Sequence, residues 1–199
     1  METGSNHKTR AAWYAFLFAS LASSMSTADP LHPFGNEGAW RHEYSGWQFA
    51  KQVGGFSREL APYTIDGNDD AGVSYEYASS GPRITAIVEI YLADSAAPDA
   101  TLDGARASAA RKAGDSAHAQ AEQPFRVDAR EAVRGIKITY AADGTPTGAQ
   151  TSLYFFEASR WTVKVLGSTD SASDDTGKVL DAFVQALPWK TLGDPAALH

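Results

Sequence analysis

The fold is decided by the stretch QTSLYFFE-ASR-WTVKVLG, which occupies residues 150–167. Both arms are rich in β-branched and aromatic residues, and both alternate as half-buried strands do. Leu153 and Phe155 share one face of the first arm, whereas Trp161, Val163 and Val165 share one face of the second. A break of three residues between such arms is a hairpin connection. We therefore predict a β-hairpin at the centre of an antiparallel sheet.

Other segments supply neighbours for this hairpin. Val73–Tyr77 alternates, a Ser-Ser-Gly-Pro turn follows, and Arg83–Leu92 carries apolar residues on both faces, as an inner strand does. The sheet resumes after Pro124, with Gly135–Tyr140 as a strand and Asp143-Gly144 as a turn into the central hairpin.

Two helices are expected. Residues from Pro98 to about Gln123 are rich in alanine and predict one long helix, weakened by Gly104 and Gly114. His118 falls on its weaker half, where a solvated surface position is expected.

The second helix covers 173–187, and Ser171 with Asp174 resembles a capping box at its start. Its apolar stripe consists of Val179, Leu180, Phe183, Val184 and Leu187.

Composition excludes several classes of protein. The chain has 199 residues, a formal net charge of −7 and no cysteine. Scattered basic residues argue against nucleic acid, which needs a basic footprint. Absent cysteine excludes disulfides, thiolate zinc sites and cysteine nucleophiles.

The N-terminus predicts export. A basic start (Lys8, Arg10), an apolar run over 11–22 and small residues up to Ala28 form the pattern of a secretory signal peptide. A retained anchor and an ordinary helix are the alternatives, although the run is short for a bilayer span of about 20 residues. We expect a signal peptide over 1–28, an irregular lead-in over 29–46, one α+β domain over 47–189 and a tail over 190–199. The mature protein is then periplasmic or secreted, without a stable membrane span.

Two places are rich in potential metal ligands. His32, His42 and Glu43 lie in the lead-in, but His42-Glu43 lacks a second histidine at helical spacing. The Asp66–Asp70 turn imitates a calcium loop, but Ala71 replaces the required glycine and Tyr77 the twelfth-position carboxylate. We expect no metal or other cofactor at either place, and a hairpin turn at the second.

The order of strands, helix, strands and C-terminal helix resembles the PsbP-like fold. The likeness covers about Trp47 to Trp189 and rests on VGGF (53–56), VSYEY (73–77) and ALPW (186–189). It is greatest to uncharacterised, small exported bacterial proteins. The resemblance implies an antiparallel sheet sandwiched between the long alanine-rich helix and the C-terminal amphipathic helix. It supplies no catalytic or cofactor-binding residue.

Two functions remain open at this point. The first is a non-catalytic binding or accessory protein of the bacterial cell envelope, holding an envelope protein or a small ligand. The alternative is an envelope hydrolase or metal-dependent enzyme with a site near His42, Glu43 and the Asp66–Asp70 turn. The first is favoured because no catalytic motif, such as a nucleophile elbow or a phosphate loop, is present.

Overall fold

The computed structural model describes residues 31–34, 38–65, 69–78, 80–129, 133–142, 149–171 and 173–193. Its strands are β1 (Leu31–Phe34), β2 (Ala39–His42), β3 (Gln48–Phe49), β4 (Gln52–Val53), β5 (Phe56–Arg58), β6 (Tyr63–Ile65), β7 (Asp70–Tyr77), β8 (Ile84–Leu92), β9 (Ala117–Arg126), β10 (Arg134–Ala142), β11 (Gln150–Ala158) and β12 (Trp161–Thr169). The helices are α1 (Leu102–Ala113) and α2 (Asp174–Ala186), with short 3₁₀ turns η1 (Pro98–Ala100) and η2 (Trp189–Thr191).

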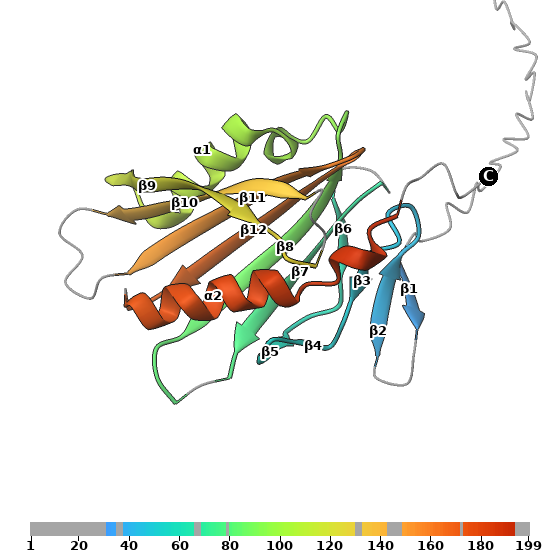
Figure 1. The fold of residues 1–199 in the computed structure, drawn as a ribbon, viewed down its shortest axis with the longest axis horizontal. Coiled ribbons are helices and arrows are strands. Elements are labelled where there is room, and N and C mark those ends of the chain that lie inside the picture. The colour runs from blue at the N-terminus through green and yellow to red at the C-terminus, as the bar shows by residue number, and fades with distance from the viewer. Residues whose placement is uncertain are drawn as a thin grey trace, which may run out of the picture.

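Nine strands form one antiparallel sheet in the order β4-β5-β7-β8-β12-β11-β10-β9, with β6 paired to β7 (Figure 1). The hairpin β11–β12 therefore lies in the middle, as predicted. Its connection is tighter than expected, because Ala158 already pairs with Trp161. Ser159 adopts a positive φ of 59° to close the two-residue loop. The predicted inner strand, β8, lies between β7 and β12.

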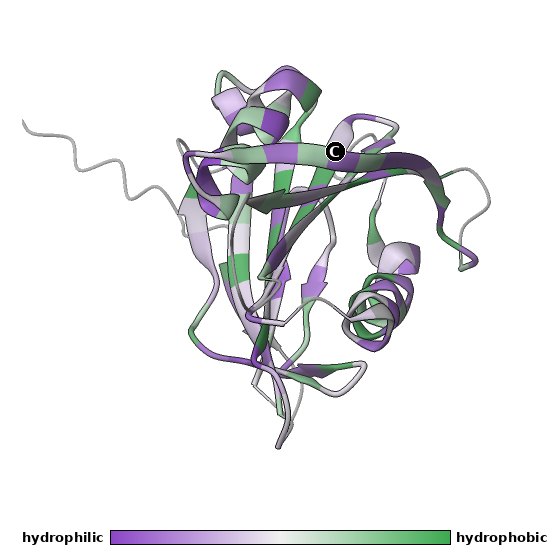
Figure 2. Cartoon of the chain, turned by 90° about the vertical axis from the view of Figure 1, so that its left-hand side faces the viewer, coloured by the Kyte–Doolittle hydropathy of each residue, from purple (hydrophilic) through white to green (hydrophobic). Residues whose placement is uncertain are grey.

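The two helices contact opposite faces of the sheet, as the alternation along β11 shows. Tyr154 and Phe156 belong to the apolar cluster that includes Phe183 of α2. Leu153 and Phe155 belong to a second cluster with α1. Successive side chains of a strand point to opposite faces, so the helices lie on different sides. Figure 2 shows α2 nearly end-on, well apart from α1. The α+β class with an antiparallel sheet and two helices is confirmed.

The C-terminal helix packs through the predicted stripe. Leu180, Phe183, Val184 and Leu187 are buried, and Val179 is partly buried against the same cluster. The cap differs from the prediction, because the capping box joins Ser173 to Thr176. Gly167 of β12 permits the close approach of the helix, since a Cβ there would lie 2.6 Å from Leu180 Cδ2.

The prediction of one long alanine-rich helix is wrong. Helix α1 has only 12 residues and stops at Gly114, whose φ of 119° is one that glycine adopts easily. The next alanine-rich segment, including His118, forms β9 and pairs with β10. Pairing with the edge of β10 overrides the high helical propensity of alanine, because tertiary context outweighs local preference. His118 is exposed there, so its surface position is correct although its element is not.

The lead-in segment packs against the last described residues of the chain. Strands β1, β2 and β3 form a small antiparallel sheet where irregular structure was expected. Trp47 packs edge-on against Trp189, with ring centroids 5.3 Å apart, and Gly193 N donates to Ser45 O at 2.7 Å. Leu192 is buried, so the first residues of the expected tail pack on the domain.

Several predictions fall outside the described residues: the signal peptide, the turn at Asp143-Gly144, and residues 66–68 of the acidic turn. None of the helices in the described part of the chain is long and apolar enough to span a membrane.

Candidate functional site

The face of the sheet that carries α1 is organised in rows of side chains. Residues that pair directly across antiparallel strands lie on the same face, close enough to touch. One apolar row consists of Ile87, Leu166, Leu153 and Ile138. Ala105 and Ala109 of α1 pack against this row, and their small side chains let the helix backbone approach closely.

The next row on the same face is made entirely of hydroxyl-bearing residues. It consists of Thr85, Ser168, Thr151 and Tyr140, which pair in that order across β8, β12, β11 and β10. We call it the hydroxyl row. It lies two residues away from the apolar row on each strand, beside the C-terminal end of α1.

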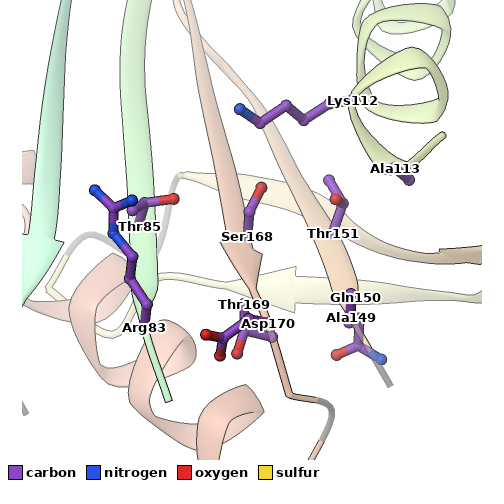
Figure 3. A pocket seen from close by; sticks show the side chains of 10 residues that line it. All are labelled: Arg83, Thr85, Lys112, Ala113, Ala149, Gln150, Thr151, Ser168, Thr169 and Asp170. Atoms are coloured by element: carbon purple, nitrogen blue, oxygen red, sulfur yellow. The ribbon is translucent and has the colours of Figure 1, made fainter. Parts of the chain in front are cut away.

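A cavity of about 280 Å³ opens over this row where α1 ends. Figure 3 shows its lining side chains, with Lys112 entering from α1 above Ser168. The lining residues are Arg83, Thr85, Lys112, Ala113, Ala149, Gln150, Thr151, Ser168, Thr169 and Asp170. The termination of α1 at Gly114 thus leaves polar groups of the sheet uncovered by helix.

The two cations of the lining differ in their partners. Arg83 donates to both carboxylate oxygens of Glu76, at 2.8 and 3.2 Å, and lies 3.6 Å from Glu59. These hydrogen bonds raise the pKa of Arg83 and lower the pKa of Glu76. Lys112 makes no ion pair with any residue that the structure describes. Among the described lining residues, the cation without an ion-pair partner therefore lies at the α1 end of the cavity.

One hydroxyl of the row lacks a partner. The Ser168 Oγ atom is shielded from solvent and forms no hydrogen bond with the described residues. Thr169, the next residue, is held differently: its hydroxyl donates to Ser171 O at 2.9 Å and accepts from Ser171 N at 3.2 Å. Glu89 Oε2, Ser152 Oγ and Trp161 Nε1 are likewise shielded without a hydrogen bond to the described residues, so the position of Ser168 in the cavity lining is what distinguishes it.

The described lining residues offer hydroxyls and charges. They include no histidine and one carboxylate, that of Asp170. A serine nucleophile needs a base within hydrogen-bond reach, and Ser168 Oγ has no such neighbour among the described residues. The groups present can instead hold a polar ligand through hydroxyl hydrogen bonds and one charge.

His42 and Glu43, the sequence-predicted alternative site, occupy different environments. His42 is fully buried: its Nδ1 lies 2.8 Å from Ser45 Oγ and its ring packs edge-on against Trp161 at 5.9 Å. Glu43 is exposed and pairs with His32 at 3.2 Å. His42 is the last residue of β2 and Glu43 begins the turn that follows, so one side chain is buried and the other faces solvent.

Asp70 does not lie in an exposed turn. It begins β7, is 2% exposed, and accepts hydrogen bonds from Leu92 N at 2.8 Å and from Ser95 Oγ at 2.5 Å. Its carboxylate therefore fastens the segment after β8 to the sheet. Only Asp69 of the remaining acidic turn is described, and it is exposed.

Sequence reasoning missed a buried charge cluster on the α1 face. Lys164, only 2% exposed, forms ion pairs with Glu89, at 2.6 Å, and with Asp99 of η1. Tyr63 donates to Glu89 at 3.4 Å. The available signal was a lysine in the middle of an otherwise apolar strand, because such a charge needs a partner when buried.

Neither these carboxylates nor the histidines assemble a metal site: no group of three or more potential ligands occurs among the described residues. Comparison with known proteins adds no constraint on the cavity, because no family model, curated protein or solved structure matches the chain.

Proposed function

We propose that the chain is an exported, non-catalytic binding protein of the bacterial cell envelope, and that it holds a small ligand in the cavity beside the end of α1. The observation that carries this proposal is the hydroxyl row. A sheet face that is apolar beneath α1 carries the hydroxyls of Thr85, Ser168 and Thr151 one row later, where the cavity opens. Convergent polar groups in a concavity are the usual mark of a ligand site.

Export and the fold family are part of the proposal and rest on the sequence. The basic, apolar and small segments of residues 8–28 support a signal peptide. The PsbP-like sandwich is supported by two helices that contact opposite faces of an antiparallel sheet. The alternative, a hydrolase or metal-dependent enzyme, is less well supported because His42 is buried while Glu43 faces solvent.

The binding site can be tested by ligand-induced stabilisation. A ligand that binds only the folded protein stabilises it by about 2.7 kcal/mol at 100 times its dissociation constant. We expect at least one member of a diverse metabolite collection to raise the Tm of the wild type but not of Ser168→Leu, which fills the cavity. Ala107→Leu, at an exposed position of α1, should respond as the wild type does.

Should Ser168→Leu fail to fold, Thr85→Val supplies the second test, because it removes a row hydroxyl with little change in shape. The proposed site would be refuted if no compound stabilised the wild type, or if stabilisation were the same in the wild type and in the cavity variants. Stabilisation only by a co-purified envelope protein would replace the small ligand with a protein partner and would also refute the site.

Export is tested separately. Mass spectrometry of protein from the native host should find a mature chain that starts near Asp29 in the envelope or the medium. An intact Met1 on a cytosolic product would contradict export without affecting the cavity.

A further inference from the structure

We infer that the cavity selects a small monocarboxylate that carries several hydroxyl groups, as a sugar acid does. This inference rests on the proposed function, because it names the ligand class of the same site. It follows from three properties of the lining: the spacing of its hydroxyls, the placement of its charges, and its size.

The hydroxyl row matches a ligand with several hydroxyls. Thr85, Ser168 and Thr151 lie on adjacent strands, and such strands are about 4.8 Å apart. Each hydroxyl can both donate and accept a hydrogen bond. A row of this kind can bind a chain or ring of hydroxyl groups, in which each oxygen is also both donor and acceptor. Ser168 Oγ is shielded from solvent and forms no hydrogen bond with the described residues, so a ligand hydroxyl that reached it would satisfy a buried polar atom.

The charges indicate one negative group at one end of the ligand. The Lys112 ammonium has no ion-pair partner among the described residues and lies above Ser168 (Figure 3). The guanidinium of Arg83 is already held by Glu76. An anion is therefore attracted chiefly by Lys112, in a protein whose net charge of −7 repels anions elsewhere.

Asp170 sets a limit on the ligand's charge. Its carboxylate belongs to the lining on the side of the cavity away from Lys112 (Figure 3). A second negative group placed there would be repelled, whereas a ligand hydroxyl could donate to Asp170. The arrangement therefore disfavours phosphate esters and dicarboxylates relative to a monocarboxylate with hydroxyls at its other end.

The size of the cavity limits the ligand to one small unit. Cavities that hold drug-sized ligands span about 300–1,000 Å³. A volume of about 280 Å³ lies just below that range and suits a single hexose-sized molecule.

Isothermal titration calorimetry with matched probes tests the ligand class. D-Glucuronate, D-glucose and D-glucosamine share a hydroxylated ring but differ in charge, and D-gluconate is an open-chain sugar acid. Acetate tests charge without hydroxyls, and glucose 6-phosphate tests a dianion. We expect a sugar acid to bind at least about tenfold more tightly than glucose, glucosamine, acetate or glucose 6-phosphate, which corresponds to one charge-assisted hydrogen bond.

Two variants locate the binding. Lys112→Gln should weaken sugar-acid binding by about tenfold, whereas Lys178→Gln, which alters an exposed lysine of α2, should leave it unchanged. Ser168→Ala should weaken it severalfold. Both lining variants should melt within a few degrees of the wild type, because Lys112 is exposed and Ser168 Oγ has no hydrogen bond to lose among the described residues.

The possible results separate the two proposals. Equal binding of glucose and glucuronate, tighter binding of glucose 6-phosphate, or full affinity in Lys112→Gln would overturn the ligand class. Failure of both sugar acids, while another compound stabilises the wild type but not Ser168→Leu, would also overturn the ligand class and leave the proposed binding function standing. Failure of every compound in both experiments would overturn both.

Discussion

The two faces of the central sheet are built from alternate residues of the same strands, yet they differ in chemistry. The face that contacts α2 is largely aromatic and aliphatic, with Phe56, Tyr75 and Phe183 in ring contact. Its polar groups include Lys137, which pairs with Asp181 of α2 at 2.7 Å. The face that contacts α1 changes from row to row. Lys164 and Glu89 form a charged row, Leu166 lies in the apolar row, and Ser168 lies in the hydroxyl row. One face thus supplies most of the stability, while the other can hold polar groups at defined positions.

The largest expected effect comes from the α2 face. Phe183→Ala should lower the free energy of unfolding by about 3–5 kcal/mol, because it deletes a fully buried ring that contacts Phe56 and Tyr75. Urea denaturation measures the change, and Lys178→Ala, at an exposed site of the same helix, should shift it by less than about 0.5 kcal/mol. A loss below about 1 kcal/mol in Phe183→Ala would show that this face is not the main core.

The second-largest loss of stability is expected when the charge of Lys164 on the α1 face is removed. Lys164→Met should cost about 3 kcal/mol, because it leaves the partly buried carboxylates of Glu89 and Asp99 without their cation. Adding Glu89→Gln to this variant should recover part of the loss, since one uncompensated charge is removed. Chemical denaturation of the single and double variants decides the matter; a double variant less stable than Lys164→Met would contradict the cluster.

Packing beneath α1 should give a smaller effect. Ala109→Leu should destabilise the protein by about 1–3 kcal/mol, because the fully buried alanine leaves no room for a larger side chain against the apolar row. Ala107→Leu, the same substitution on the exposed side of the same helix, is the matched control. Equal Tm values for the two variants would mean that α1 can move away from the sheet at little cost.

The last prediction concerns buried tyrosines, whose ionisation changes the stability of the protein only at high pH. Burial raises the pKa of Tyr75, Tyr91 and Tyr154. Tyr63 is 43% exposed, and partial burial beside the Glu89 carboxylate raises its pKa to about 12. Folding favours the protonated phenols, so their contribution is fully present below about pH 10 and decreases as the pH rises through 12. Ultraviolet titration should find these phenols resistant to ionisation until the protein unfolds. Ordinary titration near pH 10 in a folded protein would contradict their burial.

The sequence could predict those elements that a local pattern of residues defines. Alternation in residues 150–167 and the helical stripe from Val179 to Leu187 are local patterns, and both elements were predicted correctly. Strand β9 was not, because its alanine-rich sequence prefers a helix and only the edge of β10 makes it a strand.

The candidate site could not be predicted from local patterns in the sequence. Thr85, Thr151 and Ser168 are separated by up to 83 residues of chain, and only the pairing register brings them into one row. His42 attracted attention as a possible ligand because its burial against Trp161 cannot be read from its neighbours.

The contacts between the lead-in and the chain end also constrain the order of events during biosynthesis. Trp47 packs on Trp189, and the carbonyl of Ser45 accepts from the amide of Gly193. A chain that is still being synthesised therefore lacks these packing and hydrogen-bond partners of residues 45–47 until residues 189–193 have been added. A fragment that ends at Pro188 should show Trp47 exposed to a fluorescence quencher; a fully protected Trp47 would remove this link between the chain ends and the timing of folding.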